Sequence, residues 1–461
     1  MKYVIAVVMT LLSVFVWFSL LTGPDRTKQE YQKAMESARD YEERQIYRKA
    51  LDYYEEAGKY ADKKQKYSIG MKIVEMSVEL NDAASYEKEC KNLIKNYPSK
   101  KKPYEQLLKY YQAKEDIKEL VPFLKKTKKR FPKEEIFHKA YRKLEEDYTQ
   151  SGESYDEISD WLRGYALVKT SGNQTEQQNF LTPEKEETDY RTGKIFQVLD
   201  SQTTVEADGI NGERIVMSDH PGELLLRQDK KKQWSMIDGD GNITENNPDA
   251  GIEEAGPYID HYAAAKIKGK YYWINQTMRT SKRSFDMLGS FWEGTAPVCQ
   301  DGKWALFSAE KFQEITKYCF SDIKRDEFGR GMVADRMFAT KDSGYQMYNR
   351  DGKRMGAESF EDAKPFVSEE PAAVKQSDRW GFADRNGKLV IDGKYEEAGS
   401  FAYGYAAVKQ DGKWGVINEQ DEMVIKPCYQ MIKSFNSEGY AAVQTDDGKW
   451  SFIRMNTIAY R

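Results

Sequence analysis

The 461-residue chain has little of the material from which catalytic and metal sites are commonly built. Its 3 histidines and 4 cysteines are scattered, and no CxxC, HExxH, GxSxG or P-loop pattern occurs. So few cysteines do not make a disulfide framework, and their spacing does not suit a zinc site. The sequence therefore predicts a protein that is not an enzyme, with no catalytic residues, no cofactor and no metal.

A strong net charge is also absent, since the whole chain carries −4 at pH 7. The charge is nevertheless divided, with +7 over residues 1–150 and −11 over the remainder. An acidic second part argues against nucleic acid as a partner, because phosphate backbones are bound by clustered lysine and arginine.

What the chain does contain is a repeated phrase. Residues 404–417 read GYAAVKQDGKWGVI, and altered copies follow one another along the second two thirds of the chain. Within these copies an aromatic residue recurs at intervals of 33 to 41 residues, at Trp234, Tyr271, Trp304, Tyr345, Trp380, Trp414 and Trp450. With an earlier copy that starts at Tyr155, there are eight degenerate copies from about Tyr155 to Ile453. A period of this size indicates stacked supersecondary units.

Each copy holds about three short β-prone runs, for example Leu389–Ile391, Ala406–Val408 and Trp414–Ile417. Asn-Gly and Asp-Gly pairs between the runs supply the positive φ of tight hairpins. One unit cannot bury its apolar face alone, so we expect stacked neighbours. Because neither terminus shows an obvious strand to complete a unit begun at the other, we expect an open or superhelical array of antiparallel strands, with a closed propeller as the alternative.

These phrases resemble the WG-repeat family of bacterial proteins, named for the pair seen here as Trp380-Gly381 and Trp414-Gly415. The resemblance covers roughly residues 155–453, although Ser235, Ala305, Gln346 and Ser451 replace the glycine elsewhere. It implies structural repeat-motif residues rather than an active site. These residues are Trp234, Trp304, Trp380, Gly381, Trp414, Gly415 and Trp450. We expect the tryptophans to fill the space between units.

Residues 27–150 have a different character, with apolar residues at helical spacing among dense lysine and glutamate. Glu43–Tyr60 carries an i, i+3/i+4 stripe that predicts an amphipathic helix. Tyr97-Pro98 and Phe131-Pro132 lie 34 residues apart, which is the tetratricopeptide period. The segment therefore resembles tetratricopeptide-like helical hairpins. Either a plain helical stalk or a peptide-binding groove fits this pattern.

Tyr3–Leu21 is an uncharged apolar run of 19 residues. Its length and composition suit a bilayer-spanning helix, with a cleaved signal peptide as the alternative. The sequence thus predicts three parts: an anchor or signal segment over 1–22, a helical domain over 27–150 and a β-repeat domain over 151–461. We expect a single-pass protein of the cell membrane whose body is extracytoplasmic.

Together these features predict a membrane-anchored, non-enzymatic binding or assembly scaffold at the bacterial cell envelope. Its partner would be a protein or a cell-envelope polymer. The alternative is a cell-surface glycan-binding module or carbohydrate-active enzyme, because exposed aromatic rings on β arrays can stack on sugars. Nothing in the residues identifies the ligand.

Overall fold

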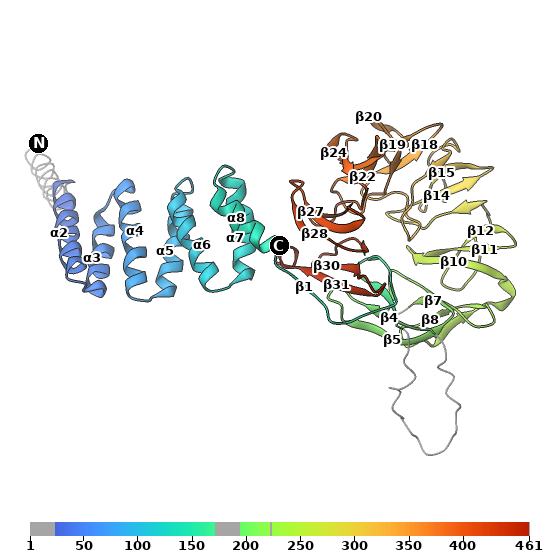
Figure 1. Ribbon diagram of the computed structural model, residues 1–461, viewed down its shortest axis with the longest axis horizontal. Coiled ribbons are helices and arrows are strands. Elements are labelled where there is room, and N and C mark those ends of the chain that lie inside the picture. The colour runs from blue at the N-terminus through green and yellow to red at the C-terminus, as the bar shows by residue number, and fades with distance from the viewer. Residues whose placement is uncertain (1–23, 171–193, 222–223, 461) are drawn as a thin grey trace, which may run out of the picture. The chain divides into compact units, whose positions relative to one another are not determined.

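The computed structural model describes residues 24–170, 194–221 and 224–460 (Figure 1). The chain divides into two compact units, Met1–Tyr141 and Arg142–Arg461. The first is helical and the second is built mainly of β-strands, so the predicted all-α region followed by an all-β repeat array is confirmed.

The helices of the first unit follow one another as α2 (Pro24–Glu43), α3 (Tyr47–Tyr60), α4 (Lys63–Glu79), α5 (Ala83–Asn96), α6 (Lys101–Ala113), α7 (Ile117–Arg130) and α8 (Glu135–Glu145). Side chains of Asp62, Asp82 and Asp116 accept hydrogen bonds from the first turns of α4, α5 and α7, which fixes where these helices begin. The predicted stripe of α3 is buried, including Leu51 and Tyr54. Burial of such a stripe is what stabilises short helices in water.

The described strands of the second unit form eight antiparallel sheets, here called blades 1 to 8 (Figure 1), and the unit also contains the short helices η1 (Pro248–Ala250) and α9 (Asn456–Ala459). Blade 1 contains β2 (Glu157–Ile158), β3 (Ala166–Thr170), β4 (Lys194–Leu199) and β5 (Val205–Gly212), and blade 2 contains β6 (Arg214–Val216), β7 (Leu225–Gln228), β8 (Trp234–Ile237) and β9 (Ile243–Asn246). Blade 3 contains β10 (Ile252–Ile259), β11 (Tyr262–Ile267) and β12 (Lys270–Ile274), and blade 4 contains β13 (Met287–Leu288), β14 (Thr295–Gln300), β15 (Lys303–Ser308) and β16 (Gln313–Glu314). Blade 5 contains β17 (Asp322–Ile323), β18 (Met337–Thr340), β19 (Tyr345–Tyr348) and β20 (Arg354–Phe360), and blade 6 contains β21 (Asp362–Ala363), β22 (Ala372–Gln376), β23 (Arg379–Ala383) and β24 (Leu389–Tyr395). Blade 7 contains β25 (Glu397–Ala398), β26 (Tyr405–Gln410), β27 (Lys413–Asn418) and β28 (Met423–Tyr429), and blade 8 contains β29 (Met431–Ile432), β30 (Tyr440–Gln444), β31 (Trp450–Met455) and β1 (Tyr148–Gln150).

The hydrophobic core of this unit lies between the blades. One cluster joins Trp414 and Tyr405 of blade 7 to Ile432 and Ala441 of blade 8, and equivalent clusters join the other successive blades. A further cluster joins Phe452 of blade 8 to blade 1. The apolar faces are therefore buried by neighbours, all the way round a ring.

A strand from the beginning of this unit closes the ring. β1 pairs with β31 in register, Thr149 opposite Arg454, and so supplies the fourth strand of blade 8. The expected open or superhelical array is therefore wrong, and the closed propeller named as its alternative is present. Sequence reasoning missed the closing strand because Tyr148-Thr149-Gln150 lies in a polar stretch without the apolar alternation of a buried strand.

The predicted single-pass membrane localisation is also corrected. Within residues 24–170, 194–221 and 224–460, no helix is long and apolar enough to cross a membrane. The apolar run Tyr3–Leu21, from which that localisation was inferred, lies outside the described residues.

Candidate functional site

Loops between the first and second strands of several blades lie on one face of the propeller, together with Ser201 from the loop between β4 and β5. These loops surround a cavity of about 380 Å³, here called the mouth pocket. Side chains from several different blades line it, among them Asp160, Arg163, Trp292, Arg330, Tyr403 and Asn436. The site therefore exists only when the ring is assembled.

Tight turns position these side chains. Arg163-Gly164 and Tyr403-Gly404 each place two consecutive residues at positive φ, with values of 48° and 88° for the first pair and 56° and 86° for the second. This is the backbone of the two-residue hairpin that suits the twist of antiparallel strands, and glycine is favoured at its second position. The first position of the turn is free to carry a side chain of another chemistry. Here it carries an arginine and a tyrosine at the rim of the pocket.

Two arginines contact the same indole ring in the pocket. The guanidinium carbon of Arg163 lies 4.7 Å from the centroid of Trp292, and that of Arg330 lies 4.4 Å away. Arg330 is only 7% exposed, and its Nε donates to Asp326 Oδ2 at 2.5 Å. Arg163 pairs with Asp260 at 2.7 Å. The cations are held in place by carboxylates behind them and by the quadrupole of the ring.

Asp160 is the carboxylate of the pocket wall. Its Oδ2 accepts from Ser434 Oγ at 3.0 Å and its Oδ1 accepts from the backbone N–H of Trp161 at 2.9 Å. Burial, followed by the nearby charge of Glu327, raises the pKa of Asp160 above its usual value. Desolvation disfavours the charged form of a carboxyl group, so this residue is shifted towards neutrality.

A long loop of blade 5, residues 324–336, reaches across the centre of the ring and is called the channel loop. Glu327 of this loop accepts from the backbone N–H of Asp160 in blade 1 and pairs with Lys433 of blade 8 at 2.7 Å. Phe328 is buried in the cluster shared by blades 1 and 2, and its carbonyl accepts from Ser290 Oγ at 2.6 Å. The channel loop thus ties blades from opposite sides of the ring to one another.

On its other side the channel loop contributes to a second cavity of about 670 Å³, the channel cavity. Two lysines that directly follow the first strands of blades 5 and 6 bridge consecutive blades here: Lys324 pairs with Asp362 at 2.6 Å and Lys364 with Glu397 at 3.0 Å. Lys364 also lies over two repeat tryptophans, 5.3 Å from the ring centroid of Trp380 and 5.6 Å from that of Trp414. The charges of this cavity are therefore already matched within the protein.

The structure places the predicted repeat-motif residues between blades and away from the mouth pocket. Trp234, Trp304, Trp380 and Trp414 are buried in the clusters between their own blade and the next, whereas Trp450 is half-buried between blades 8 and 1. Gly381 and Gly415 lie where β24 and β28 bulge over them. A Cβ at Gly381 would lie 2.4 Å from the carbonyl oxygen of Ile391.

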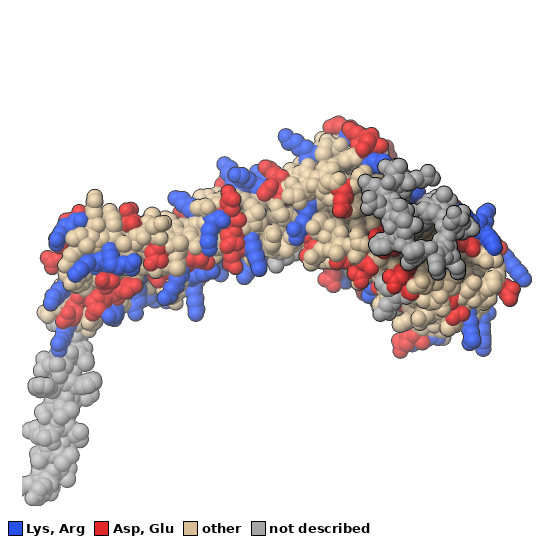
Figure 2. All heavy atoms as spheres, turned by 90° about the horizontal axis from the view of Figure 1, so that it is seen from below, with Lys and Arg blue, Asp and Glu red and all other residues tan. Residues whose placement is uncertain are grey.

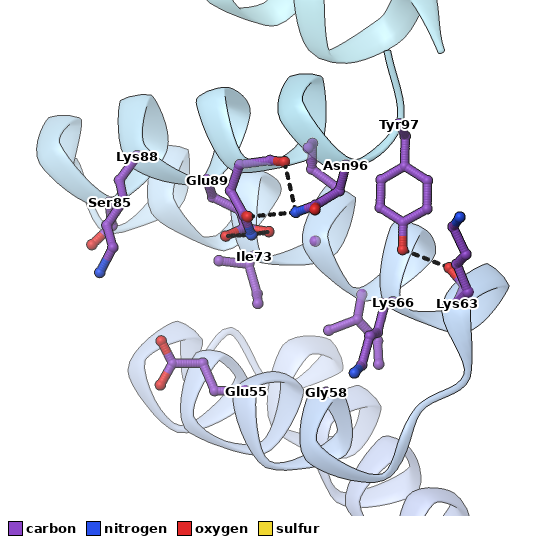
Figure 3. A pocket seen from close by; sticks show the side chains of 14 residues that line it. Glu55, Gly58, Lys63, Lys66, Ile73, Ser85, Lys88, Glu89, Asn96 and Tyr97 are labelled. Atoms are coloured by element: carbon purple, nitrogen blue, oxygen red, sulfur yellow. Dashed lines mark hydrogen bonds between the residues drawn. The ribbon is translucent and has the colours of Figure 1, made fainter. Parts of the chain in front are cut away.

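The helical unit has a hollow of its own, about 680 Å³, between α3, α4 and α5 (Figure 3). Glu89 lies in it half-buried, and burial raises the pKa of its carboxyl group. Asn92 Nδ2 donates to Glu89 Oε2 at 3.2 Å, and Asn96 Nδ2 donates to Asn92 Oδ1 at 2.7 Å. A Cβ at Gly70 would lie 2.6 Å from Leu93 Cδ2, so this glycine allows α4 and α5 to approach closely. The groove is polar, with a row of amides along one wall.

No group of three or more histidine, cysteine, aspartate or glutamate side chains suited to a metal ion occurs in the described part of the chain. On the face of the molecule shown in Figure 2, lysine and arginine are interspersed with aspartate and glutamate. The mouth pocket combines two arginines with aromatic rings.

Eight antiparallel sheets arranged in a closed ring define a β-propeller. Within it, three segments match the WG containing repeat, residues 283–304, 380–414 and 414–450. The chain thus carries WG repeats, as the sequence predicted. No curated protein matches the sequence.

Solved structures with similarity to this chain include propellers. The β-propeller domain of Myceliophteria thermophila Cps50 (Swd1) is 10% identical, with 67% of this chain and 98% of that chain covered and a TM-score of 0.33. The Neurospora crassa Pan2 WD40 domain is 11% identical, with 52% and 88% covered and a TM-score of 0.30. Similarity at this level does not bear on function, and the propeller follows from the strand pairing of this chain itself.

Sequence reasoning missed the mouth pocket. Two of its turn residues, Arg163 and Tyr403, immediately precede the glycine of a Gly-x-Ala-x-Val motif. The signal was variation inside a repeated phrase: the Ala and Val positions hold the core, while the position before the glycine changes chemistry from copy to copy. The contacts of the channel loop had no comparable signal, because its partners lie in distant copies.

Proposed function

We propose that this protein is a non-enzymatic binding scaffold whose propeller holds a protein partner at the mouth pocket. The observation that carries this proposal is the pair of arginines around Trp292, framed by Trp161 and Tyr403 at the same rim. Tryptophan, tyrosine and arginine are the residues that dominate the energy of protein interfaces when they cluster in a pocket. Tight turns hold them in one conformation, which lowers the entropic cost of binding.

The internal pairing of charges supports the choice of the mouth pocket over the channel cavity. In the channel cavity Lys324 and Lys364 each pair with a carboxylate of the next blade and Lys433 pairs with Glu327, so a ligand would have to break these pairs. At the mouth, the side chain of Arg163 remains 43% exposed. A partner can therefore reach it without disturbing the ring.

The helical groove provides a second surface to the same scaffold. Its row of Asn92 and Asn96 amides can pair with both the N–H and the C=O groups of an extended chain. We place the principal interaction at the propeller, because the mouth pocket combines aromatic and cationic groups from several blades.

A matched pair of turn variants in the full chain tests this proposal. Tyr403→Gly removes a rim side chain at a residue whose φ of 56° glycine adopts without strain. Asp411→Gly makes the same kind of change at φ 52°, at the other end of β26 and away from the pocket. We expect a native partner that is cross-linked to the wild type and to Asp411→Gly but is lost from Tyr403→Gly.

If the wild type, Tyr403→Gly and Asp411→Gly all capture the partner equally, the partner does not bind at the mouth pocket. Capture of a cell-wall glycan instead of a protein, lost in the same variant, would favour the glycan-binding alternative. Thermal unfolding of both variants must match before capture is compared, because Tyr403 also packs against the core of blades 7 and 8.

A further inference from the structure

Several N–H donors of the mouth pocket have no acceptor among the described residues. Arg330 is nine-tenths buried, and its only side-chain hydrogen bond within the described residues runs from Nε to Asp326. The terminal nitrogens Nη1 and Nη2 of Arg330, and Nη1 of Arg163, have no acceptor there. The indole Nε1 of Trp292 is buried and likewise has no acceptor among the described residues. Trp292 Nε1 is thus a buried donor without an acceptor, which is costly, and the terminal guanidinium nitrogens are charged donors with which the acceptor oxygens of a ligand can pair.

We propose that the mouth pocket is a carboxylate-binding site, in which Arg330 and Arg163 beside Trp292 hold an acidic group of an extended partner segment. This rests on the proposed function and names the chemistry of the partner. The planar guanidinium presents two parallel N–H groups that match the two oxygens of a carboxylate. A lysine of the partner has no acceptor for these donors, and a neutral amide offers a single acceptor oxygen without the charge that strengthens the bond.

The carboxylates around the pocket do not oppose this assignment. Asp326 and Asp260 already accept hydrogen bonds from the two guanidinium groups, and Asp219 lies 3.4 Å from Arg163 Nε. They hold the two arginines in place, while Nη1 of Arg163 and both terminal nitrogens of Arg330 remain available to a ligand. Asp160 is the acidic residue of the pocket lining itself, and burial shifts it towards its neutral form.

The position of Trp292 explains how one pocket can hold two arginines. Both guanidinium groups lie within 5 Å of its ring centroid, where the electron-rich face offsets part of the repulsion between like charges. A cavity of about 380 Å³ accommodates one or two side chains, and Trp161 and Tyr403 add apolar surface at its edge. The pocket thus fits an acidic residue next to an apolar or aromatic one.

Fluorescence polarisation with labelled peptides on the full chain tests the assignment. The probes are a capped peptide of alternating serine and glutamate, the same peptide with lysine or with phosphoserine in place of glutamate, and a serine peptide with a free C-terminal carboxylate. We expect the glutamate peptide to bind more tightly than the lysine and phosphoserine peptides. Comparison with the serine peptide distinguishes a side-chain carboxylate from a chain terminus, and binding of either supports the site.

Variants then connect binding to the two arginines. Arg163→Gln should weaken binding of the glutamate peptide about tenfold, the loss expected for one charge-assisted hydrogen bond. Arg163→Lys should recover only part of it, because lysine keeps the charge but not the fork. Arg279→Gln, at an exposed arginine of a blade 3 turn, is the control and should leave binding unchanged. Arg330→Gln should abolish binding of the glutamate peptide. If Arg330→Gln does not fold, binding by Arg163→Gln alone decides whether the arginines are required.

Unchanged binding in Arg163→Gln, or a preference for the lysine or phosphoserine peptide, would overturn the carboxylate site. This failure is distinguishable from failure of the scaffold. A native partner lost in Tyr403→Gly while no acidic peptide binds leaves the scaffold standing with the wrong ligand chemistry. If the glutamate peptide binds and Arg163→Gln weakens it, but no native partner is lost in Tyr403→Gly, the carboxylate site is supported and the proposed scaffold function is contradicted.

Discussion

Gly415 shows why a glycine follows the repeat tryptophan. Opposite it, β28 bulges between Ile425 and Tyr429, and a Cβ at Gly415 would lie 2.5 Å from the carbonyl oxygen of Ile425. We expect Gly415→Ala to destabilise the propeller by about 1–3 kcal/mol, because rigid backbone has to move. Gly399→Ala is the control, since its nearest atom would be 3.9 Å away. Chemical denaturation measures the difference, and equal stability of the two variants would contradict the steric explanation.

Trp414 belongs to the same repeat and is 3% exposed between blades 7 and 8. Trp414→Ala removes a large side chain from a packed cluster and should cost about 3–5 kcal/mol. Hydrogen exchange should show lost protection in the strands after about residue 350, with the helical unit unaffected. Val390→Ala, at a side chain that is 49% exposed, should leave this pattern unchanged. Normal protection with loss of a ligand would instead make Trp414 a binding residue.

How far the sequence predicts the site can be judged from these residues. Trp380 and Trp414 were predictable as repeat residues because the same type recurs at one position of each copy. Arg163, Trp292 and Arg330 were not, because they stand at positions where the copies differ and meet only through the ring. Periodicity reveals the residues that recur in every copy because every blade needs them for packing, whereas a site made by several blades depends on residues that occur in one copy only.

At the scale of elements, the hairpins were predictable and the closing strand was not. Asp411-Gly412 adopts the positive φ values that its sequence predicts, 52° and 78°. Tyr148-Thr149-Gln150 carries no such signal, because an edge strand with intermediate and exposed side chains needs no apolar alternation. Its identity comes from pairing with β31, far away in the sequence. Local chemistry therefore predicted each unit of the array but not how the array ends.

β1 offers a test of closure through single backbone donors. Ser151 N donates to Phe452 O at 2.8 Å, and donors that face a neighbouring antiparallel strand recur at every second residue. Thr149 N therefore faces β31 and Gln150 N faces away. Thr149→Pro should lower the melting temperature of the propeller more than Gln150→Pro, because only the first removes a ladder hydrogen bond. Equal melting temperatures would show that β1 contributes little to closure.

An ion pair links the segment after blade 3 to the outer strand of blade 4. Arg283 Nη1 donates to Glu314 Oε2 at 3.0 Å, and the hydrogen bond from this arginine lowers the pKa of Glu314 from 4.5 to about 2. The folded protein then binds this proton more weakly than the unfolded chain. The contribution of Glu314 is fully present above about pH 4.5 and is lost as the pH falls towards 2.

Thermal unfolding of Glu314→Gln and wild type across this range measures that contribution. The difference in melting temperature should be present at neutral pH and shrink as the pH falls from 4.5 to 2. Both side chains are partly exposed, so we expect a small difference that salt reduces further. Glu310→Gln, at an exposed neighbour, should show no such trend. A constant difference at all pH values would exclude the ion pair as its cause.

At the scale of the whole molecule, we expect the helical and propeller units to unfold separately. They share no repeat, and each has its own hydrophobic clusters. Eight of the 9 tryptophans lie after residue 160, so tryptophan fluorescence reports on the propeller, whereas circular dichroism at 222 nm is dominated by the helices. Two transitions with different midpoints are expected, and a single coincident transition by both probes would contradict this.

The pairing of β1 with β31 in blade 8 also determines when the propeller can close during synthesis. Ser151, beside β1, and Ser451, in β31, are 300 residues apart, yet the hydroxyl of Ser451 donates to the carbonyl of Ser151. At about 5–20 residues per second, a ribosome would release β1 roughly 15 to 60 seconds before its partner strand exists. Until then the ring stays open and its strand edges remain available to other chains. A messenger RNA truncated before the codon of Trp450 would therefore yield a propeller without β31, in which blade 8 is incomplete and the ring does not close. Such a product would be exposed to aggregation and proteolysis.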